Sequence, residues 1–597
     1  MEEKAGGFKY DARTAADLFR EIADLLELLG EEPFKAPAYR RAAAVIQRYA
    51  AEIPRLAEEG QLTSLPGIGE ILARKVNEIL STGTVELLER LRSRVPPGVQ
   101  ALLGVPGLGP RTVATLWRAG VEDLDTLEEM AATGRLRQLP GFGPQKEKAI
   151  LEAIATVKRQ GGLWLGEAWV AAKEISARLE TLAGVERVEP AGFVRRAAWQ
   201  VPQLEFVVVR EADSVDPDLD LTDLAAELGK MLGVPVHIYV TTPERFGAVL
   251  LWATGGEMHL AELAPVLTAR GLLLGPEGLL RRVASSTPEG KGNGTADHPA
   301  DSSPDLPSEL VVTPDEESVY RYLGLAPIPP ELRDRPGMVD LAAKGQVPRL
   351  VELADIQGDL HVHTSWSDGR ASLAEMARAA ATRGLRYLAV TDHSASLRVA
   401  NGLEAERLKL QWEELDRTRS AFPELELLRG IEIEIRTDGQ LDYDEEIRSR
   451  FQWVNASIHT GFSSDAAQIR RRLLAAMKDP ATCAISHPTG RRLGMRRPYA
   501  LTLEHLLEDA LATGVALEIN CSPERLDLSP EWAEAAFRAG VPLTISTDSH
   551  SPDGMAVMEL GVRLARRAGL PPEAILNAQP LSVVREHAER RRSAAGR

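Results

Sequence analysis

The stretch DLHVHTSWSDG, residues 359 to 369, places two histidines and two aspartates around one short apolar run. Imidazole and carboxylate at this density are typical of a metal site. From about residue 355 to 590, short apolar segments alternate with segments of helical period. That alternation predicts a parallel α/β barrel-like domain over residues 350 to 590.

Metal-ligating side chains also follow the later apolar segments. Parallel barrels place their chemistry at the carboxyl ends of the strands, and six of the chain's 11 histidines fall there. The expected ligands are His361, His363, Asp368, His393, Glu432, His459, His487, Asp548 and His550. Asp359 is expected to support them rather than to bind an ion. Imidazole and carboxylate without thiolate suit Zn²⁺, Mn²⁺ or Fe²⁺, and nine ligands are too many for one ion.

We therefore expect two or three divalent ions and hydrolysis of a phosphoester by a hydroxide that bridges two of them. The order and spacing of the segments resemble the PHP (polymerase and histidinol phosphatase) phosphoesterase family. The matching motifs are HVHT, SDG, TDH, GIEIEI, SIHT, SHPTG and STDSH. The resemblance implies a distorted, seven-stranded (β/α)7 barrel with a trinuclear centre.

Polar residues near these motifs are candidates for binding substrate phosphate. They are Arg491, Arg492, Arg496, Arg497, Asn520 and Arg525. Arginine beside a phosphoesterase centre suits phosphate oxygens. A solvated charged face is the alternative for the arginine run.

One pattern occurs three times in the first 160 residues: LPGIG at 65 to 69, VPGLG at 105 to 109 and LPGFG at 139 to 143. Each copy precedes a helical period, so proline and two glycines form a tight hairpin that exposes helix N-terminal amides. A single copy would be read as a simple turn, but three copies favour nucleic-acid binding. They resemble helix-hairpin-helix motifs, which implies contact with DNA phosphates. The residues concerned are Gly67, Gly69, Lys75, Gly107, Gly109, Arg111, Gly141, Gly143 and Lys146.

The surrounding segments have a 3.6-residue apolar period, which predicts helical units over residues 1 to 95 and 96 to 160. Of the chain's net charge of −17, these 160 residues contribute about −1, with 22 basic and 23 acidic side chains. DNA would therefore be held through specific contacts rather than through bulk charge. The 597 residues predict several domains. Two cysteines without a CxxC pair, no signal peptide and no long apolar run predict a cytoplasmic protein. With the expected DNA binding, we expect it to be nucleoid-associated.

Residues 161 to 275 combine a helix with β-rich runs, and residues 276 to 345 contain a low-complexity insert at 285 to 310 that we expect to be disordered. With the hairpin units and the barrel, this order resembles the bacterial and archaeal DNA polymerase X family over all but the insert. The resemblance implies an α+β nucleotidyltransferase-like palm, a thumb-like region, and a monomer that binds gapped, nicked or 3′-recessed duplex DNA. Lys75 falls where relatives with lyase activity carry a Schiff-base lysine, although a surface lysine is the simpler interpretation.

The polymerase pattern breaks at the palm. Gly192, Arg195 and Arg196 fit it, but Phe193 replaces the serine. Gln203, Glu205 and His237 stand at the three positions of the metal carboxylates. Because Mg²⁺ requires anionic oxygen ligands, we predict a palm that does not hold Mg²⁺ and has little or no nucleotidyl transfer activity.

The family resemblance implies a DNA-repair enzyme whose PHP centre acts as a 3′-5′ exonuclease or 3′-end phosphodiesterase, whereas the ligands alone predict only metal-assisted phosphoester hydrolysis. An active gap-filling polymerase with PHP proofreading is a second hypothesis, against which the missing aspartates count. A DNA-binding adaptor with a structural barrel conflicts with nine intact ligands. A PHP small-molecule phosphatase does not explain the hairpin motifs.

Overall fold

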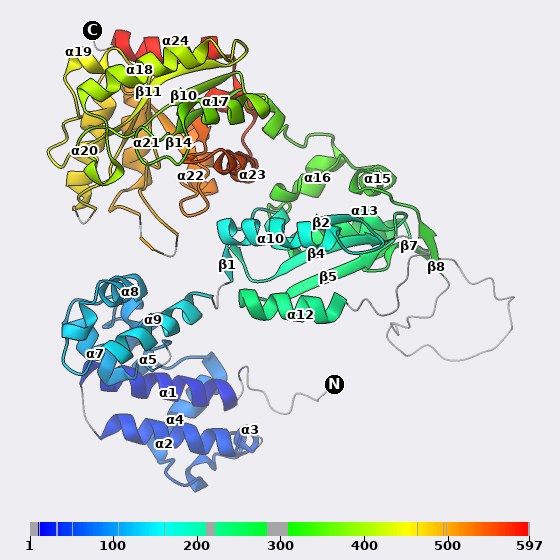
Figure 1. Ribbon diagram of the computed structural model, residues 1–597. Coiled ribbons are helices and arrows are strands. Elements are labelled where there is room, and N and C mark those ends of the chain that lie inside the picture. The colour runs from blue at the N-terminus through cyan, green and yellow to red at the C-terminus, as the bar shows by residue number, and fades with distance from the viewer. Residues whose placement is uncertain are drawn as a thin grey trace, which may run out of the picture. The chain divides into compact units, whose positions relative to one another are not determined.

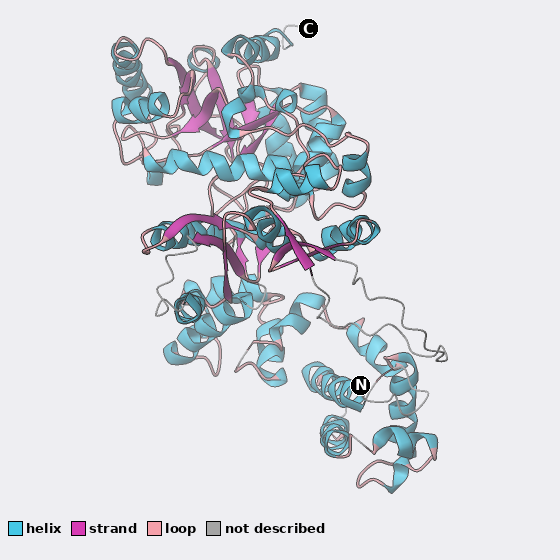
Figure 2. Ribbon diagram, turned by 90° about the vertical axis from the view of Figure 1, so that its right-hand side faces the viewer, coloured by secondary structure: helices cyan, strands magenta, loops and turns pink. Residues whose placement is uncertain are grey.

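The computed structural model describes residues 10, 12–30, 34–50, 52–105, 107–159, 162–210, 221–282, 308–462, 464–493, 495–496 and 498–594. The chain forms two compact units, Met1–Gln160 and Gly161–Arg597 (Figures 1 and 2). No helix among the described residues combines the length and the apolar composition that a membrane span requires.

The first unit is helical throughout its described residues, as the sequence predicts. Its helices are α1 (Ala12–Leu29), α2 (Lys35–Arg48), α3 (Ile53–Glu58), α4 (Glu70–Thr82), α5 (Glu86–Arg92), α6 (Pro97–Leu102), α7 (Pro110–Arg118), α8 (Leu124–Ala132) and α9 (Pro144–Arg159). Apolar residues at helical spacing, such as Phe19 and Ile22, form one buried core. Each of the three glycine patterns immediately precedes a helix, α4, α7 or α9, so the repeats share one local geometry.

The second unit begins with a small α+β region. The sheet has the order β2-β4-β5, with β2 (Val185–Pro190) antiparallel to β4 (Leu204–Arg210) and β4 parallel to β5 (Val236–Thr241). A short ladder pairs β1 (Leu163–Trp164) with β3 (Gln200–Val201). The helices are α10 (Leu165–Glu180), α11 (Gly192–Arg195), α12 (Leu221–Leu232) and α13 (Phe246–Thr254). The two strands predicted in this region are both present, and β4 is buried because it is apolar almost throughout.

The next segment packs a three-stranded antiparallel sheet against helices. Its elements are α14 (Glu257–Ala269), β6 (Leu272–Gly275), β7 (Gly278–Arg282), β8 (Ser308–Val311), α15 (Glu316–Tyr322) and α16 (Met338–Ala343). The predicted insert at 285 to 310 lies outside the described residues except for its last three, which belong to β8. That end of the prediction is wrong because Leu310 pairs with Leu280 of β7 and Val311 packs against the local core.

The remainder of the unit is a parallel barrel of seven strands. They are β9 (Gly358–Val362), β10 (Tyr387–Val390), β11 (Glu426–Glu434), β12 (Trp453–Ser457), β13 (Ala484–Ile485), β14 (Ala516–Asn520) and β15 (Leu543–Ser546). Each strand pairs with its neighbour in chain order. A parallel bridge between Val362 and Ser549 brings the first and last strands together and nearly closes the barrel. The fold predicted from the alternating segments is therefore confirmed.

Helices cover the outside of the barrel (Figures 1 and 2). They are α17 (Leu373–Thr382), α18 (Ala405–Arg419), α19 (Glu445–Arg448), α20 (Ala466–Lys478), α21 (Leu503–Thr513), α22 (Pro530–Ala539), α23 (Met558–Arg567) and α24 (Leu581–Ala594). Because both faces of the sheet are covered, strands such as β12 and β14 are buried along their whole length. All loops after the strands then meet at one end of the barrel.

A buried ion-pair network stabilises the region between the palm sheet and the barrel. Glu316 accepts hydrogen bonds from Arg333 Nη1 at 2.8 Å and from Arg195 Nη2 at 2.6 Å. Arg333 is 1% exposed and also donates to the carbonyl of Ile328 at 3.1 and 3.2 Å. Burial alone would raise the pKa of Glu316, but the charges of Arg333 and Arg195 outweigh it and lower that pKa to about 2.

Replacing Arg333 with Met should destabilise the second unit. The change keeps the side-chain volume but leaves the buried Glu316 carboxylate with one partner fewer, so the free energy of unfolding should fall by about 3 kcal/mol. Arg321→Met is the matched control, because Arg321 pairs with Glu317 on the same helix with side chains 70% and 65% exposed. Arg321→Met should lower the free energy of unfolding by less than about 1 kcal/mol. Equal losses in urea denaturation would contradict a special role for the buried pair.

Candidate metal centre

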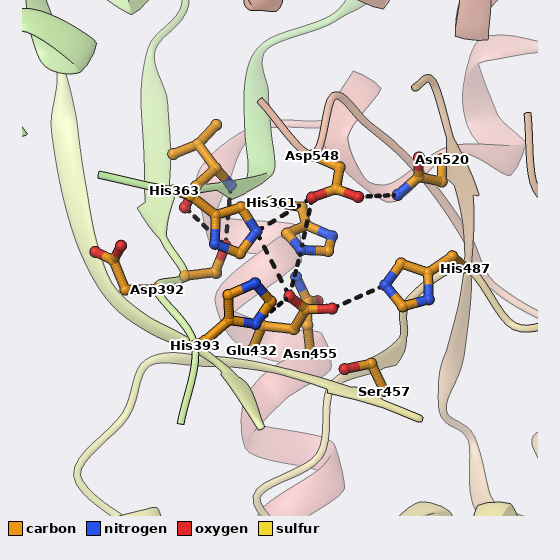
Figure 3. Close-up of polar contacts among 12 residues, drawn as sticks. His361, His363, Asp392, His393, Glu432, Asn455, Ser457, His487, Asn520 and Asp548 are labelled. Carbon is orange, nitrogen blue, oxygen red and sulfur yellow. Dashed lines mark hydrogen bonds and ion pairs between the residues drawn. The ribbon is translucent and has the colours of Figure 1, made fainter. Parts of the chain in front are cut away.

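Glu432, on β11, lies at the centre of the cluster at the carboxyl ends of the strands (Figure 3). Its Oε2 atom lies 3.0 Å from His393 Nδ1 and 3.3 Å from His361 Nε2. Its Oε1 atom lies 2.9 Å from His487 Nε2 and 3.3 Å from His459 Nε2. Glu432 is itself only 1% exposed, so a single buried carboxylate organises imidazoles from four other loops and strands.

The structure brings eight of the nine expected ligands into three groups whose donor atoms lie within 4.8 Å of one another. The groups are His363, Asp368, His393 and His550; then His361, His363 and Asp548; and lastly His393, Glu432 and His459. His487 stands outside them and contacts Glu432 instead. Because His363 and His393 each belong to two groups, the groups overlap in the way that a site for several ions requires.

Several donor atoms of the cluster lack hydrogen bonds. Both ring nitrogens of His363, Nε2 of His361, Nδ1 of His393 and Oε2 of Glu432 are buried without a hydrogen-bond partner among the described residues. An unpaired buried polar atom costs roughly 1–3 kcal/mol, and a cation bound by these atoms would offset that cost. Nitrogen and oxygen donors without thiolate suit divalent transition metals. The residues therefore fit divalent metal ions.

Two further carboxylates hold the histidines from behind. Glu518 on β14 lies 2.7 Å from His361 Nδ1, and Glu434 on β11 lies 2.9 Å from His459 Nδ1. These contacts leave the Nε2 atoms of both rings facing Glu432 and fix the ring orientations. Glu434 and Glu518 were not among the residues predicted from the sequence. In the sequence, each of these carboxylates stands two residues from another polar residue of the same strand. Residues two apart in a strand point to the same face, which is the pattern that could have identified them.

Asp359 and Asp392 support the cluster without facing it. Asp359 Oδ1 accepts the backbone N–H groups of His361 and Thr547, each at 3.2 Å, and so ties the first strand to the last. Burial raises the pKa of Asp359 to about 6. Asp392 accepts hydrogen bonds from Thr364 and Ser367 and thereby fixes the loop that leads to Asp368.

The side chains of the cluster have pKa values that are shifted in opposite directions. Burial, followed by the charges of His550 and His393, lowers the pKa of His363 to about 3. Burial acts against protonation of His393 too, but Glu432 and Asp368 raise its pKa to about 10. The surrounding imidazoles hold the pKa of Glu432 well below its usual range despite burial. Ionised carboxylate and neutral His363 are the forms that bind cations.

Two members of the cluster adopt strained backbone conformations. His487 has a φ of 32° and Asp548 a φ of 53°. Such conformations cost roughly 1–3 kcal/mol in residues other than glycine and concentrate at functional sites. Glu518 accepts the backbone N–H of His487 at 2.7 Å, and Asn520 donates to Asp548 at 3.2 Å.

The expected phosphate-binding residues divide into two sets. Asn520 and Arg525 both reach Asp548, Arg525 with its Nε atom 3.4 Å from Asp548 Oδ2. Solvent reaches the cluster at Asp368 and His550, because their side chains are 35% and 36% exposed. Among the described members of this group, Asn520 and Arg525 touch the cluster.

The arginine run lies against other protein groups. Arg491 packs over the Trp199 ring at 4.4 Å, Arg492 pairs with Glu524, and Arg496 lies over the Phe462 ring at 3.7 Å. Arg497 is outside the described residues. Phosphate binding by these arginines stays a prediction.

At the palm, Gly192 and Glu205 pack against each other. A Cβ on Gly192 would lie 1.5 Å from Glu205 Oε2, so the Glu205 side chain lies directly against the start of α11. Burial raises the pKa of Glu205, and Gln203 is its hydrogen-bond partner. His237 is the register partner of Glu205 on β5 but is exposed. The three groups of metal-ligating donors found in the described part of the chain all lie in the barrel.

Arg195 and Arg196, the two palm arginines that fit the polymerase pattern, also contact other protein groups. Arg195 binds Glu316, as described above. Arg196 pairs with Asp334 at 3.0 Å and lies over the Phe193 ring at 4.6 Å. Both arginines are therefore committed to contacts within the protein.

The three hairpins share one backbone geometry. Gly67, Gly107 and Gly141 have φ values of 79°, 85° and 84°, which require glycine. Gly69 and Gly109, in contrast, are extended, and a Cβ on either would meet nothing within 4 Å. Neither backbone conformation nor space requires glycine at these second positions, which are the N-cap positions of α4 and α7.

The remaining hairpin residues flank these turns. A Cβ on Gly143 would likewise meet nothing within 4 Å. Arg111 pairs with Glu27 at 2.8 Å and is 88% exposed, and Lys146 lies over the Phe142 ring at 4.4 Å. Lys75 is half-buried, and burial lowers its pKa.

Comparisons with known proteins agree with this architecture. Family profiles match as "Helix-hairpin-helix domain" at residues 12–85, "SAM-like Helix-hairpin-helix tandem" at 99–156, "DNA polymerase beta thumb" at 249–334 and "PHP domain" at 359–521. The chain is 34% identical over 582 residues to "DNA polymerase/3'-5' exonuclease PolX" of Bacillus subtilis (strain 168), covering 95% of this chain and 97% of that protein. Over 231 residues the chain is also 29% identical to a "Probable phosphatase" of Syntrophotalea carbinolica (strain DSM 2380 / NBRC 103641 / GraBd1), covering 37% of this chain and 90% of that protein.

Replacing Glu432 with Gln should remove bound metal. The change keeps the side-chain shape but deletes the charge that the clustered imidazoles share, so metal affinity should fall by about 100-fold. Metal content per chain after dialysis, measured by inductively coupled plasma mass spectrometry, checks this. Glu426→Gln is the matched control, because Glu426 is on the same strand with its side chain 37% exposed and pairs with Arg585. Equal metal content in both variants would contradict a role for Glu432 at the centre.

Proposed function

Because the chain belongs to the DNA polymerase X family, we propose that it is a DNA-repair enzyme that shortens DNA 3′ ends by metal-dependent phosphodiester hydrolysis in its barrel. The observation that carries the proposal is the buried cluster around Glu432, in which several ligand atoms lack a hydrogen-bond partner. DNA is the substrate we propose because three hairpin motifs precede the barrel on the same chain. A small phosphomonoester would give these hairpins no role.

The cluster would hold two or three divalent ions, for which we propose Mn²⁺, Zn²⁺ or Fe²⁺. Ions bound there supply Lewis acidity that polarises phosphoryl oxygens and activates water for attack. Glu434 and Glu518 keep the imidazoles of His459 and His361 in the ligating orientation. Arg525 beside Asp548 is placed to bind a phosphate oxygen of the substrate. Burial of the cluster keeps bulk water away, which strengthens every electrostatic interaction inside it.

We propose that the hairpins hold the sugar-phosphate backbone of gapped, nicked or 3′-recessed duplex DNA. The second glycine of each hairpin leaves the helix N-terminal amides open to a phosphate, which favours this contact. The corresponding domains would be the helical units 1 to 95 and 96 to 160, the palm 161 to 275, the thumb-like region 276 to 345 and the barrel 350 to 590. The protein would act as a monomer at the nucleoid.

We also propose that the palm has lost nucleotidyl transfer activity. Of the three positions expected to hold metal carboxylates, only Glu205 is anionic, and it is buried against Gly192. Two-metal phosphoryl transfer needs several anionic oxygen ligands around Mg²⁺. The palm would then serve as a structural platform.

The variant His361→Ala, His363→Ala should lose 3′-end shortening while it still binds DNA. Removing two imidazoles from the cluster should lower Mn²⁺-dependent degradation of a labelled 3′-recessed duplex by about 100-fold or more. Fluorescence anisotropy should give an unchanged dissociation constant for the duplex. His505→Ala is the control, because this exposed barrel histidine contacts Thr502 away from the cluster. Undiminished degradation by the double variant would remove the barrel from the mechanism.

On a gapped duplex with dNTPs, the wild-type protein should add no nucleotides with either Mg²⁺ or Mn²⁺. The physical reason is that Glu205 cannot by itself hold two ions against the charge of the triphosphate. Primer extension on a sequencing gel checks this, and Glu205→Ala should leave the pattern unchanged. Robust gap filling by the wild-type protein would favour an active polymerase with a proofreading barrel.

A further inference from the structure

Two loops at the carboxyl end of the barrel are joined by hydrogen bonds into one unit, called the loop layer below. One loop follows β13 and contains Thr489 and Leu493. The other follows β14 and contains Glu524 and Asp527. The Thr489 backbone N–H and hydroxyl donate to Asp527 Oδ2 at 2.9 and 2.8 Å. The Leu493 N–H donates to the Glu524 carbonyl at 2.6 Å. Because hydrogen bonds join them at both ends, a displacement of one loop displaces the other.

This loop layer reaches the metal centre through Arg525. Its Nε atom lies 3.4 Å from Asp548 Oδ2, and Asp548 Oδ1 lies 3.1 Å from His363 Nε2. The Arg525 side chain is only 16% exposed, so its position follows that of the loop backbone. The orientation of Asp548 therefore depends on where the loop layer is held.

The palm holds the loop layer at two points. The guanidinium of Arg491 lies over the Trp199 ring at 4.4 Å, and its Nε atom donates to the Arg525 carbonyl at 2.8 Å. Gly166, in the first turn of α10, lies so near the second loop that a Cβ there would be 2.2 Å from the Pro523 carbonyl oxygen. Only glycine allows this backbone approach without displacement of the loop.

The Trp199 ring, over which Arg491 lies, is itself in contact with a second aromatic ring. Trp164, from β1, packs edge-on against Trp199 with ring centroids 6.5 Å apart. Arg491 is 9% exposed, so its position is set by the Trp199 ring rather than by solvent. A continuous path of contacts leads from β1 through Trp199, Arg491 and Arg525 to Asp548.

We propose that the palm acts as a positioning element for the metal centre of the barrel, with Trp199 and Arg491 as positioning residues. The inference rests on the proposed function of that centre. It gives the palm a role that does not depend on nucleotidyl transfer. It also assigns Arg491 to the support of Arg525 rather than to direct binding of substrate.

Kinetics of 3′-end shortening with the full-length protein and Mn²⁺ test the proposal. Trp199→Ala removes the surface on which Arg491 rests, so kcat should fall by about tenfold while KM changes by less than about twofold. Trp199→Phe keeps an aromatic face and should restore most of kcat. Lys173→Ala is the control, because it breaks the Lys173–Glu559 contact of 2.6 Å between palm and barrel without touching the loop layer.

Hydrogen–deuterium exchange gives a readout that does not depend on activity. Peptides covering residues 487–493 and 520–527 should exchange faster in Trp199→Ala but not in Trp199→Phe or Lys173→Ala. Gly166→Ala perturbs the loop layer at its second contact with the palm. Its added methyl group should push on Pro523 and produce the same loss of kcat.

The outcomes separate the two proposals. Wild-type kcat and wild-type exchange in both Trp199→Ala and Gly166→Ala would overturn the positioning role. Equal losses in Lys173→Ala would overturn it too, because the effect would then belong to the whole interface. If the wild-type protein shortens no 3′ ends but exchange responds to Trp199→Ala as expected, the positioning inference is supported and the proposed function fails.

Discussion

The buried carboxylate of Glu432 is the constraint on which the site depends. It contacts His361, His363, His393, His459 and His487 at distances of 2.9 to 3.5 Å, in a space almost closed to solvent. A buried charge is tolerated only when it is paired, yet several of the surrounding donors have no hydrogen bond. The parallel barrel makes the cluster possible because it brings seven strand ends to one place.

Much of this arrangement could be predicted from the sequence. Histidines that follow apolar segments identified the strand ends, since parallel strands bring their carboxyl ends together. Glu434 and Glu518 escaped notice because a carboxylate within a strand gives no sign of which histidine it holds. The role expected for Arg491 depended on sequence proximity to His487, whereas its neighbour in space is Trp199, nearly 300 residues away in the chain. Such contacts between distant segments follow from packing and cannot be read from local pattern.

The palm residues that fit the polymerase pattern make contacts within the protein. Gly192 keeps its left-handed conformation, with a φ of 57°, but the space above it is filled by Glu205. Arg195 and Arg196 pair with Glu316 and Asp334 instead of remaining free for a ligand. Trp199 and helix α10 then contact the loops of the barrel at Arg491 and Pro523.

Anomalous X-ray diffraction from crystals grown with Mn²⁺ is a direct test of the proposed metal centre in the barrel. We expect two or three anomalous peaks among the Glu432 carboxylate and the surrounding imidazoles, each at a coordination distance of about 2.0–2.3 Å from nitrogen or oxygen. We expect no peak beside Glu205. A barrel without anomalous density, or a Mn²⁺ ion bound at the palm, would contradict the proposed metal centre.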